Sequence, residues 1–125
     1  MTEVFLSLVP SSGKHTAKKN AVLRTSRGVR NASHVVDAQR DYHRQARTQM
    51  GDRGLLVGPV EVVAEFIGPW AHEGVTVPDL TNIAELVFDA IQKVVIVNDA
   101  QIARCTLAKV KGDAVKVWLT VREVK

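Results

Sequence analysis

The sequence predicts a single α+β domain, in which a mixed β-sheet of about five strands packs with two helices. Three patterns indicate this fold class. Residues 60–67 place apolar side chains at every second position, as a strand with one buried face does. Apolar residues recur at helical spacing over residues 82–93. Two further β-type segments close the chain. The length of 125 residues fits one domain, which we assign to residues 1–125.

The first half of the chain predicts one strand, one long loop and one helix. Residues 4–9 are apolar and are followed by Pro10, which ends a strand. Residues 11–30 are polar and basic, and they predict a long loop with a short hairpin as an option inside it. Ser33 is a suitable N-cap for a helix that runs to Met50, before Gly51. The apolar stripe of this helix is Val35, Tyr42, Ala46 and Met50.

The second half predicts four strands and the second helix. A strand over residues 60–67 follows Gly58-Pro59, and the helix over residues 82–93 follows a loop. Residues 94–97 are all apolar and predict a short buried strand. Strands over residues 102–110 and 115–124 are joined by a turn at 111–113. The buried face of the last strand is formed by Val115, Val117, Leu119 and Val121.

Charge is divided unevenly along the chain. Residues 1–53 carry ten Lys/Arg and four Asp/Glu, residues 54–103 carry one and seven, and residues 104–125 carry six and two. Lysines and arginines neutralise phosphates, whereas clustered carboxylates become tolerable when a hard cation binds them. A basic flank on each side of an acidic centre therefore indicates a metal-dependent enzyme that acts on nucleic acid.

The remaining bulk properties predict a cytoplasmic protein. The single cysteine, Cys105, excludes an internal disulfide and suits a reducing compartment. The sequence has no apolar run of about 18–20 residues, the length needed to cross a bilayer. The apolar start of the chain lacks the basic lead-in of a signal peptide. We therefore expect neither secretion nor a membrane partner.

Basic residues cluster in the predicted loop and on the first predicted helix. Arg40, Arg44 and Arg47 are four and three residues apart, so they share one helix face. This face is either a solvated surface or a surface that contacts phosphates, and the basic loop before it favours the second reading. The candidate DNA-binding residues are Lys14, Lys18, Lys19, Arg24, Arg27, Arg30, Arg40, Arg44 and Arg47.

Two aspartates form the candidate metal site. Asp79 precedes the second helix, and Asp99 follows the predicted strand over residues 94–97. The helix would carry the chain away by roughly 18 Å. An antiparallel return strand would bring back roughly 16 Å. The two carboxylates would then meet and form a seat for Mg²⁺. The alternative is structural: Asp79 interacts with the helix N-terminus, Glu85 closes a capping box with Asn82, and Asp99 belongs to an ordinary turn.

Residues 78–91, Pro-Asp-Leu-Thr-Asn-Ile-Ala-Glu-Leu-Val-Phe-Asp-Ala-Ile, together with Asn-Asp-Ala-Gln-Ile at 98–102, resemble the RusA family. These are small homodimeric, Mg²⁺-dependent endonucleases that resolve Holliday junctions in DNA recombination and repair, and they are often prophage-encoded. The resemblance implies an α+β fold, branched DNA as the partner, and Mg²⁺ as the cofactor, with Mn²⁺ as a substitute. It implies that Asp79 and Asp99 are metal-binding residues. It also matches Asn82 to the motif asparagine and Asp89 to the mid-helix aspartate.

Three positions depart from the family pattern. Thr81 and Asn98 stand where the family has aspartates, and Glu85 stands where it has a lysine. Thr81 and Asn98 still offer neutral oxygens, and Glu85 is placed to replace a lost carboxylate. We expect a rewired catalytic site of Asp79, Glu85, Asp99 and Asp89, in which the first three bind the metal. The competing hypothesis is a dimer that binds branched DNA but has lost efficient cleavage.

No other residue pattern predicts a reaction. The four histidines lack zinc-site spacing, and Cys105 lies in a predicted strand, where a core position is expected. Trp70 and Trp118 are expected in the core or in a dimer contact rather than stacked on bases. An aromatic content of 5% argues against a surface that stacks single-stranded bases. A non-enzymatic DNA-binding or structural dimer stays open as the other class of function.

Overall fold

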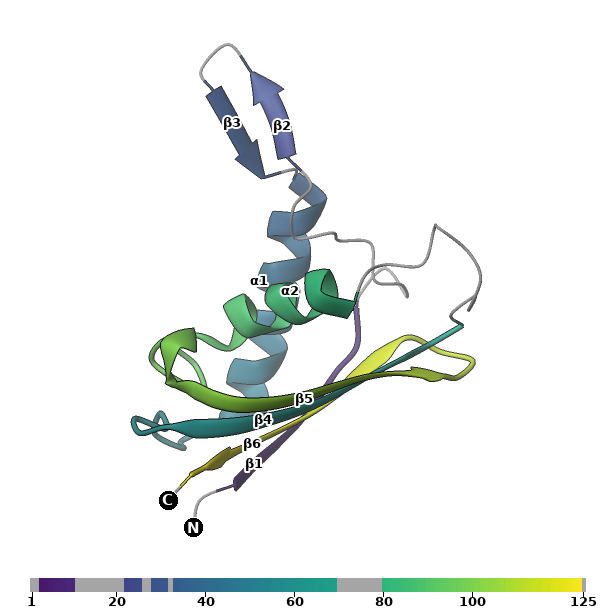
Figure 1. Ribbon diagram of the computed structural model, residues 1–125. Coiled ribbons are helices and arrows are strands. Elements are labelled where there is room, and N and C mark those ends of the chain that lie inside the picture. The colour runs from purple at the N-terminus through teal and green to yellow at the C-terminus, as the bar shows by residue number, and fades with distance from the viewer. Residues whose placement is uncertain (1–2, 11–21, 26–27, 32, 70–79, 125) are drawn as a thin grey trace.

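The computed structural model describes residues 3–10, 22–25, 28–31, 33–69 and 80–124, and Figure 1 shows how their elements are arranged. One layer is a β-sheet, and both helices lie on the same side of it. The elements in chain order are β1 (Glu3–Leu8), β2 (Val22–Thr25), β3 (Gly28–Asn31), α1 (Ser33–Met50), β4 (Val60–Gly68), α2 (Leu80–Ile91), the 3₁₀ turn η1 (Asp99–Gln101), β5 (Ile102–Lys111) and β6 (Lys116–Glu123).

The sheet is mixed and has the strand order β1-β6-β4-β5. Strands β4 and β5 run parallel, and the other two pairings are antiparallel. Strands β2 and β3 form a separate hairpin, the one foreseen as an option within the long basic loop. The α+β class and the two helices are confirmed. The main sheet has four strands rather than the expected five.

The missing strand is the one predicted over residues 94–97. These residues form a turn instead, in which the backbone N–H groups of Val94, Val95 and Ile96 all point to the carbonyl oxygen of Ile91. The side chains of these three residues are buried, and Val97 is exposed. Lys93 adopts a positive φ of 67°, which reverses the chain directly after α2. Four consecutive apolar residues are compatible with a buried strand and with a buried turn. In this protein the tertiary packing stabilises the turn.

The core lies between the helices and the face of the sheet that they cover. Strand β4 has buried side chains at every second position, and β1 and β6 present matching apolar residues in register with it. From α1, the predicted residues Tyr42, Ala46 and Met50 are all buried. From α2, the buried residues are Ile83, Ala84, Leu86, Val87, Ala90 and Ile91.

The free edge of β1 is closed by two glutamines of α1. Gln49 accepts from the backbone N–H of Ser7 at 2.8 Å and donates to the Ser7 carbonyl oxygen at 2.6 Å. Gln45 makes the same pair of bonds with Val9, at 2.8 and 2.6 Å. Residues four apart on a helix and two apart on a strand have similar spacing, so these amides act as a substitute neighbouring strand. This edge therefore presents no row of unpaired backbone groups at residues 7 and 9.

Other expectations were met closely or corrected. Helix α1 has the predicted bounds, and α2 begins and ends two residues before its predicted bounds. Cys105 is exposed and free rather than in the core, because it lies on the edge strand β5, which the helices cover only in part. Trp118 is 40% exposed, and Trp70 lies outside the described residues. Within the described part of the chain, no helix is both long and apolar enough to span a membrane.

Candidate functional site

Asp99 is the first residue of η1, and a capping box fixes its backbone. The Asn98 side chain accepts from the backbone N–H of Ala100 at 2.8 Å. The Gln101 side-chain oxygen accepts from the backbone N–H groups of Val97 and Asn98, at 2.7 and 2.9 Å. These bonds satisfy donors that a helix start leaves unpaired. The result is a tight turn that holds the exposed Asp99 at its beginning.

The nitrogen of the Gln101 amide secures this turn to the rest of the protein. It donates to the carbonyl oxygens of Leu56 and Gly58, at 2.8 and 2.9 Å, in the segment that leads into β4. A side-chain amide has one oxygen with two lone pairs and two N–H donors, so all of its bonding capacity is used. Gln101 thus ties η1 to the start of the central strand, and the position of Asp99 is set by the sheet.

The departure at Asn98 has a structural explanation. The capping role requires only a side-chain oxygen that accepts from Ala100, and an asparagine amide supplies it as well as an aspartate does. The turn is therefore kept while one negative charge next to Asp99 is lost. Since its oxygen already bonds the backbone, the structure assigns Asn98 to the cap.

Glu85 and Asp89 are one turn apart on α2 and share a face of the helix. Glu85 is exposed, whereas Asp89 is half-buried against α1. One Asp89 oxygen accepts from Gln39 Nε2 of α1 at 3.2 Å, and the other accepts from Gln92 Nε2 at 3.1 Å. Two side-chain amides orient this carboxylate. Asp89 therefore joins the two helices and keeps a fixed orientation.

The structure does not contain the return strand that was expected to bring Asp99 back beside Asp79. Figure 1 shows η1 beyond the C-terminal end of α2. Leu80, which directly follows Asp79 in the sequence, begins α2 at its other end, and twelve helical residues span about 18 Å. Asp79 itself lies outside the described residues, and so does the Asn82 side chain, while Thr81 is exposed. Among the residues described, no three His, Cys, Asp or Glu side chains form a group able to hold a metal ion.

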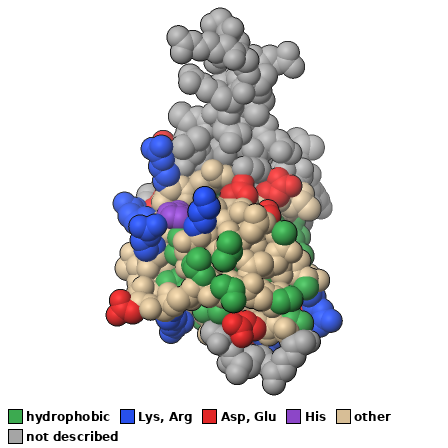
Figure 2. Space-filling model, turned by 90° about the vertical axis from the view of Figure 1, so that its left-hand side faces the viewer, with side chains coloured by type: hydrophobic (Ala, Val, Ile, Leu, Met, Phe, Trp, Pro, Cys, Tyr) green, Lys and Arg blue, Asp and Glu red, His purple; other side chains and the backbone are tan. Residues whose placement is uncertain are grey.

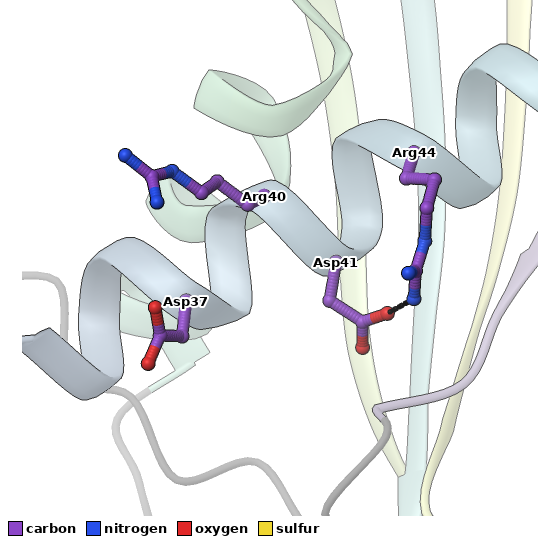
Figure 3. Close-up of a pocket in the computed structure, with 4 residues that line it drawn as sticks. All are labelled: Asp37, Arg40, Asp41 and Arg44. Carbon is purple, nitrogen blue, oxygen red and sulfur yellow. Dashed lines mark hydrogen bonds and ion pairs between the residues drawn. The ribbon is translucent and has the colours of Figure 1, made fainter.

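The three arginines of α1 are exposed, as their spacing predicted. Figure 3 shows Arg40 and Arg44 on an outer face of α1 with Asp37 and Asp41, around an open cavity of about 370 Å³. Arg44 forms an ion pair with Asp41 at 2.8 Å, so part of its charge is already balanced. The space-filling view in Figure 2 shows Lys and Arg side chains gathered around a histidine, with acidic side chains at other places on this face.

The contacts of His43 extend this basic surface to the end of α2. His43 Nδ1 bonds the Ala90 carbonyl oxygen at 2.9 Å, and its Nε2 lies 3.5 Å from Arg47 Nη2. One neutral tautomer satisfies both contacts, with Nδ1 donating and Nε2 accepting. The other candidate DNA-binding residues are not placed: Lys14, Lys18, Lys19 and Arg27 lie outside the described residues, and the side chains of Arg24 on β2 and Arg30 on β3 are not described.

Sequence reasoning gave no role to the glutamines that organise this region. The role of Gln101 was detectable, because it stands three residues after Asn98 at capping-box spacing. The bond between Gln92 and Asp89 was also detectable from their spacing of three on a helix. The contact of Gln39 with Asp89 joins residues 50 positions apart, so no local sequence pattern predicts it.

Comparison with known proteins agrees with this architecture and with the motif. The family described as Endodeoxyribonuclease RusA matches residues 12–122, which is most of the chain and includes every candidate site residue. No curated protein matches the sequence. The order of the elements accompanies the motif resemblance at 78–91 and 98–102. The closing hairpin expected from the sequence does not form, because β5 and β6 pair on opposite sides of β4 and not with each other. The chain therefore belongs to the RusA family of endodeoxyribonucleases.

Proposed function

We propose that this protein is a Mg²⁺-dependent, structure-specific endodeoxyribonuclease that cleaves phosphodiester bonds at Holliday junctions or other branched DNA, in recombination and repair. The observation that carries the proposal is the Asp99 turn. It presents an exposed carboxylate on a backbone fixed by a capping box, at a motif position of the endonuclease family that the chain matches. A site for a reactive metal needs such a rigid ligand.

Asp99 is the metal ligand on which the proposal depends, and Glu85 and Asp79 are the further candidates, with Mn²⁺ as a substitute for Mg²⁺. Carboxylate oxygens fit a hard cation, and Mg²⁺ binds with one or two of them, completed by waters and phosphate oxygens. When bound, the ion would activate water and stabilise the charge that develops on the scissile phosphate. The exposure of Glu85 and Asp99 leaves both carboxylates accessible to a cation and a phosphate.

The roles of Asp89 and Asn98 follow from their contacts. Asp89 has both carboxylate oxygens engaged by amides, which favours orientation of the helix pair over direct coordination. Asn98 caps η1 and thereby positions Asp99. Thr81 keeps an exposed hydroxyl beside the start of α2 and remains a source of a neutral oxygen.

DNA would be held by the basic residues that flank the acidic centre. Arg40 and Arg47 are exposed on α1 and form the described part of this surface, together with Arg44. The other proposed DNA-binding residues are Lys14, Lys18, Lys19, Arg24, Arg27 and Arg30. Guanidinium groups bind phosphate oxygens in bidentate fashion and fix the register of a duplex without reading its sequence.

A homodimer suits this substrate. A four-way junction offers two symmetric strands to cut, and a two-fold dimer presents one site to each. We place the protein in the cytoplasm, where an exposed free thiol such as Cys105 stays reduced.

The deciding experiment is cleavage of a synthetic four-way junction with and without Mg²⁺. We expect metal-dependent paired nicks from the wild-type protein and a loss of at least about a hundredfold in rate for Asp99→Asn. Asp113→Asn is the matched control, because Asp113 is an exposed aspartate in the turn between β5 and β6. Equal cleavage by the Asp99 and Asp113 variants would contradict the proposed site.

A second function has its own support: a dimer that binds branched DNA without cutting it. The described residues contain no three-membered acidic group, and Thr81, Glu85 and Asn98 depart from the family pattern. Tight junction binding that falls with salt, together with the absence of nicks in Mg²⁺ and in Mn²⁺, would establish this function instead.

A further inference from the structure

One face of the sheet is covered by neither helix, as Figure 1 shows. The side chains of this open face alternate with the buried ones along β1, β4 and β6, whereas β5 at the sheet edge has no buried side chain. The register of the three pairings arranges them in rows that run across the four strands. The open face consists of Glu3, Phe5 and Ser7 from β1, Lys116, Trp118, Thr120 and Arg122 from β6, Glu61, Val63, Glu65 and Ile67 from β4, and Arg104, Thr106, Ala108 and Val110 from β5.

The row at one end of this face alternates in charge. Its members, from β1 to β5, are Glu3, Arg122, Glu61 and Arg104, and each is the register partner of the next. Arg122 forms a close ion pair with Glu61 at 2.7 Å and a longer one with Glu3 at 3.9 Å. The row therefore reads negative, positive, negative, positive from one edge of the sheet to the other.

The remaining rows of the open face contain large apolar side chains that are exposed to solvent. Phe5 is 58% exposed and meets the 40% exposed Trp118 edge-on, with ring centroids 6.4 Å apart. The Lys116 ammonium group lies 4.8 Å from the centroid of the Trp118 ring. Val110 is also exposed, and Val63 and Ile67 are partly so. Aromatic rings and branched apolar side chains on a flat surface are typical of protein interfaces.

The charge of this face argues against DNA as its occupant. It carries three acids, Glu3, Glu61 and Glu65, and three bases, Arg104, Lys116 and Arg122. A surface with no net charge gains little from phosphates, because that attraction depends on releasing counterions from an excess of cations. A protein surface with a similar alternation of charge is the better match.

We infer that the open face binds the open face of a second copy of this chain. A two-fold axis parallel to the strands, between β6 and β4, places β1 over the partner's β5 and β6 over the partner's β4. The charged row of one copy then lies against the same row of the other copy in the opposite order. Glu3 faces the partner's Arg104, and Arg122 faces the partner's Glu61. The row is self-complementary under this rotation, as an isologous interface requires. Two sheets packed in this way lie about 10 Å apart, with their strands roughly aligned.

This inference rests on the homodimer of the proposed function and names its surface. It puts the helices of both copies on the outside, where their basic and acidic side chains stay accessible to DNA. It does not require nuclease activity. The tests below measure mass and self-association, so they can fail while cleavage succeeds, and the reverse is also possible.

The first test places a charge in the middle of the face. Thr120 lies on β6 between its register partners Phe5 of β1 and Val63 of β4. Thr48 is an exposed threonine of α1, on the other side of the sheet. By light scattering during gel filtration, wild type and Thr48→Arg should have twice the 13.7 kDa chain mass, and Thr120→Arg should have the mass of one chain. A dimeric Thr120→Arg variant, or a wild type that stays monomeric at all concentrations, would overturn the inference.

The second test examines the register of the two copies by a charge swap. Glu3→Arg and Arg104→Glu should each raise the dimer dissociation constant by about tenfold, because each creates two like-charge contacts across the interface. The double variant restores opposite charges between copies and should return to within about threefold of wild type. Single variants without effect, or a double variant as weak as the singles combined, would contradict the proposed two-fold arrangement.

Discussion

The side-chain nitrogen of Gln101 donates a hydrogen bond of 2.8 Å to the carbonyl oxygen of Leu56, and it thereby ties the Asp99 turn to the segment that enters β4. The same amide accepts two backbone N–H groups of the turn. A residue with no charge and no reactive group thus determines where the candidate metal carboxylate stands.

Gln101→Ala should lower the free energy of unfolding by about 1–3 kcal/mol, because it leaves several backbone groups without their partner. Urea denaturation measures this change. Gln92→Ala is the matched control: Gln92 makes one described bond, to Asp89, and its loss should cost less. An equal effect of the two substitutions would contradict the organising role of Gln101.

Removing the glutamines that close the edge of β1 should also destabilise the protein. Gln45→Ala and Gln49→Ala each delete two bonds to the β1 backbone, and each should cost about 1 kcal/mol in urea denaturation. Thr48→Ala, between them in the sequence, serves as the control, since Thr48 bonds only within α1 at Arg44. If the glutamine variants are no less stable than Thr48→Ala, the amides do not support the strand.

Stability should fall in strongly alkaline solution because of Tyr42. Burial, and then the charge of Asp41, raise the pKa of the Tyr42 phenol above its usual value. The folded protein therefore keeps this proton while the unfolded chain releases it, so the free energy of unfolding should decline as the pH rises above about 10.

Tyr42 is the only tyrosine in the chain, so its ionisation is followed by tyrosinate absorbance. We expect that signal to appear together with unfolding, and Tyr42→Phe should flatten the alkaline dependence of stability measured by urea. Ionisation of Tyr42 at its usual pKa in the folded protein would disprove the prediction.

Exposed arginines of α1 should contribute unequally to DNA affinity. Arg40→Gln and Arg47→Gln should each reduce the salt dependence of junction binding by about one phosphate contact. Arg44→Gln should have a smaller effect, because Asp41 already balances part of the Arg44 charge. Fluorescence anisotropy over a salt series measures the slopes. Arg53→Gln, at an exposed position after α1, is the control that should leave the slope unchanged.

Much of the fold was predictable because its strongest signals are local. The alternation of β4 and the apolar stripes of both helices set their bounds to within two residues. Residues 94–97 were wrongly predicted as a strand, because a short run of apolar residues shows neither helical nor strand periodicity. Only the tertiary packing shows that Val95 and Ile96 enter the core from a turn. The prediction of a core position for Cys105 was also wrong, because an edge strand exposes positions that a central strand would bury.

The metal-binding roles of Asp79, Glu85 and Asp99 stay predictions. The capping-box spacing of Asn98 and Gln101, which fixes the backbone of Asp99, was present in the sequence. The estimate that a return strand would bring Asp99 beside Asp79 was wrong in its premise, because that strand does not form. The contact between Gln39 and Asp89 depends on how α1 packs on α2, which no single segment encodes.

Titration of Mn²⁺ into the purified protein by calorimetry tests the central claim most directly, since it measures the metal site without requiring turnover. If the Asp99 turn holds the ion, Asp99→Asn should weaken binding by at least about tenfold. Glu85→Ala should weaken it as well, and Asp113→Asn should match the wild type. Unchanged Mn²⁺ affinity in Asp99→Asn would show that the metal, if bound, is held elsewhere, and would contradict the account.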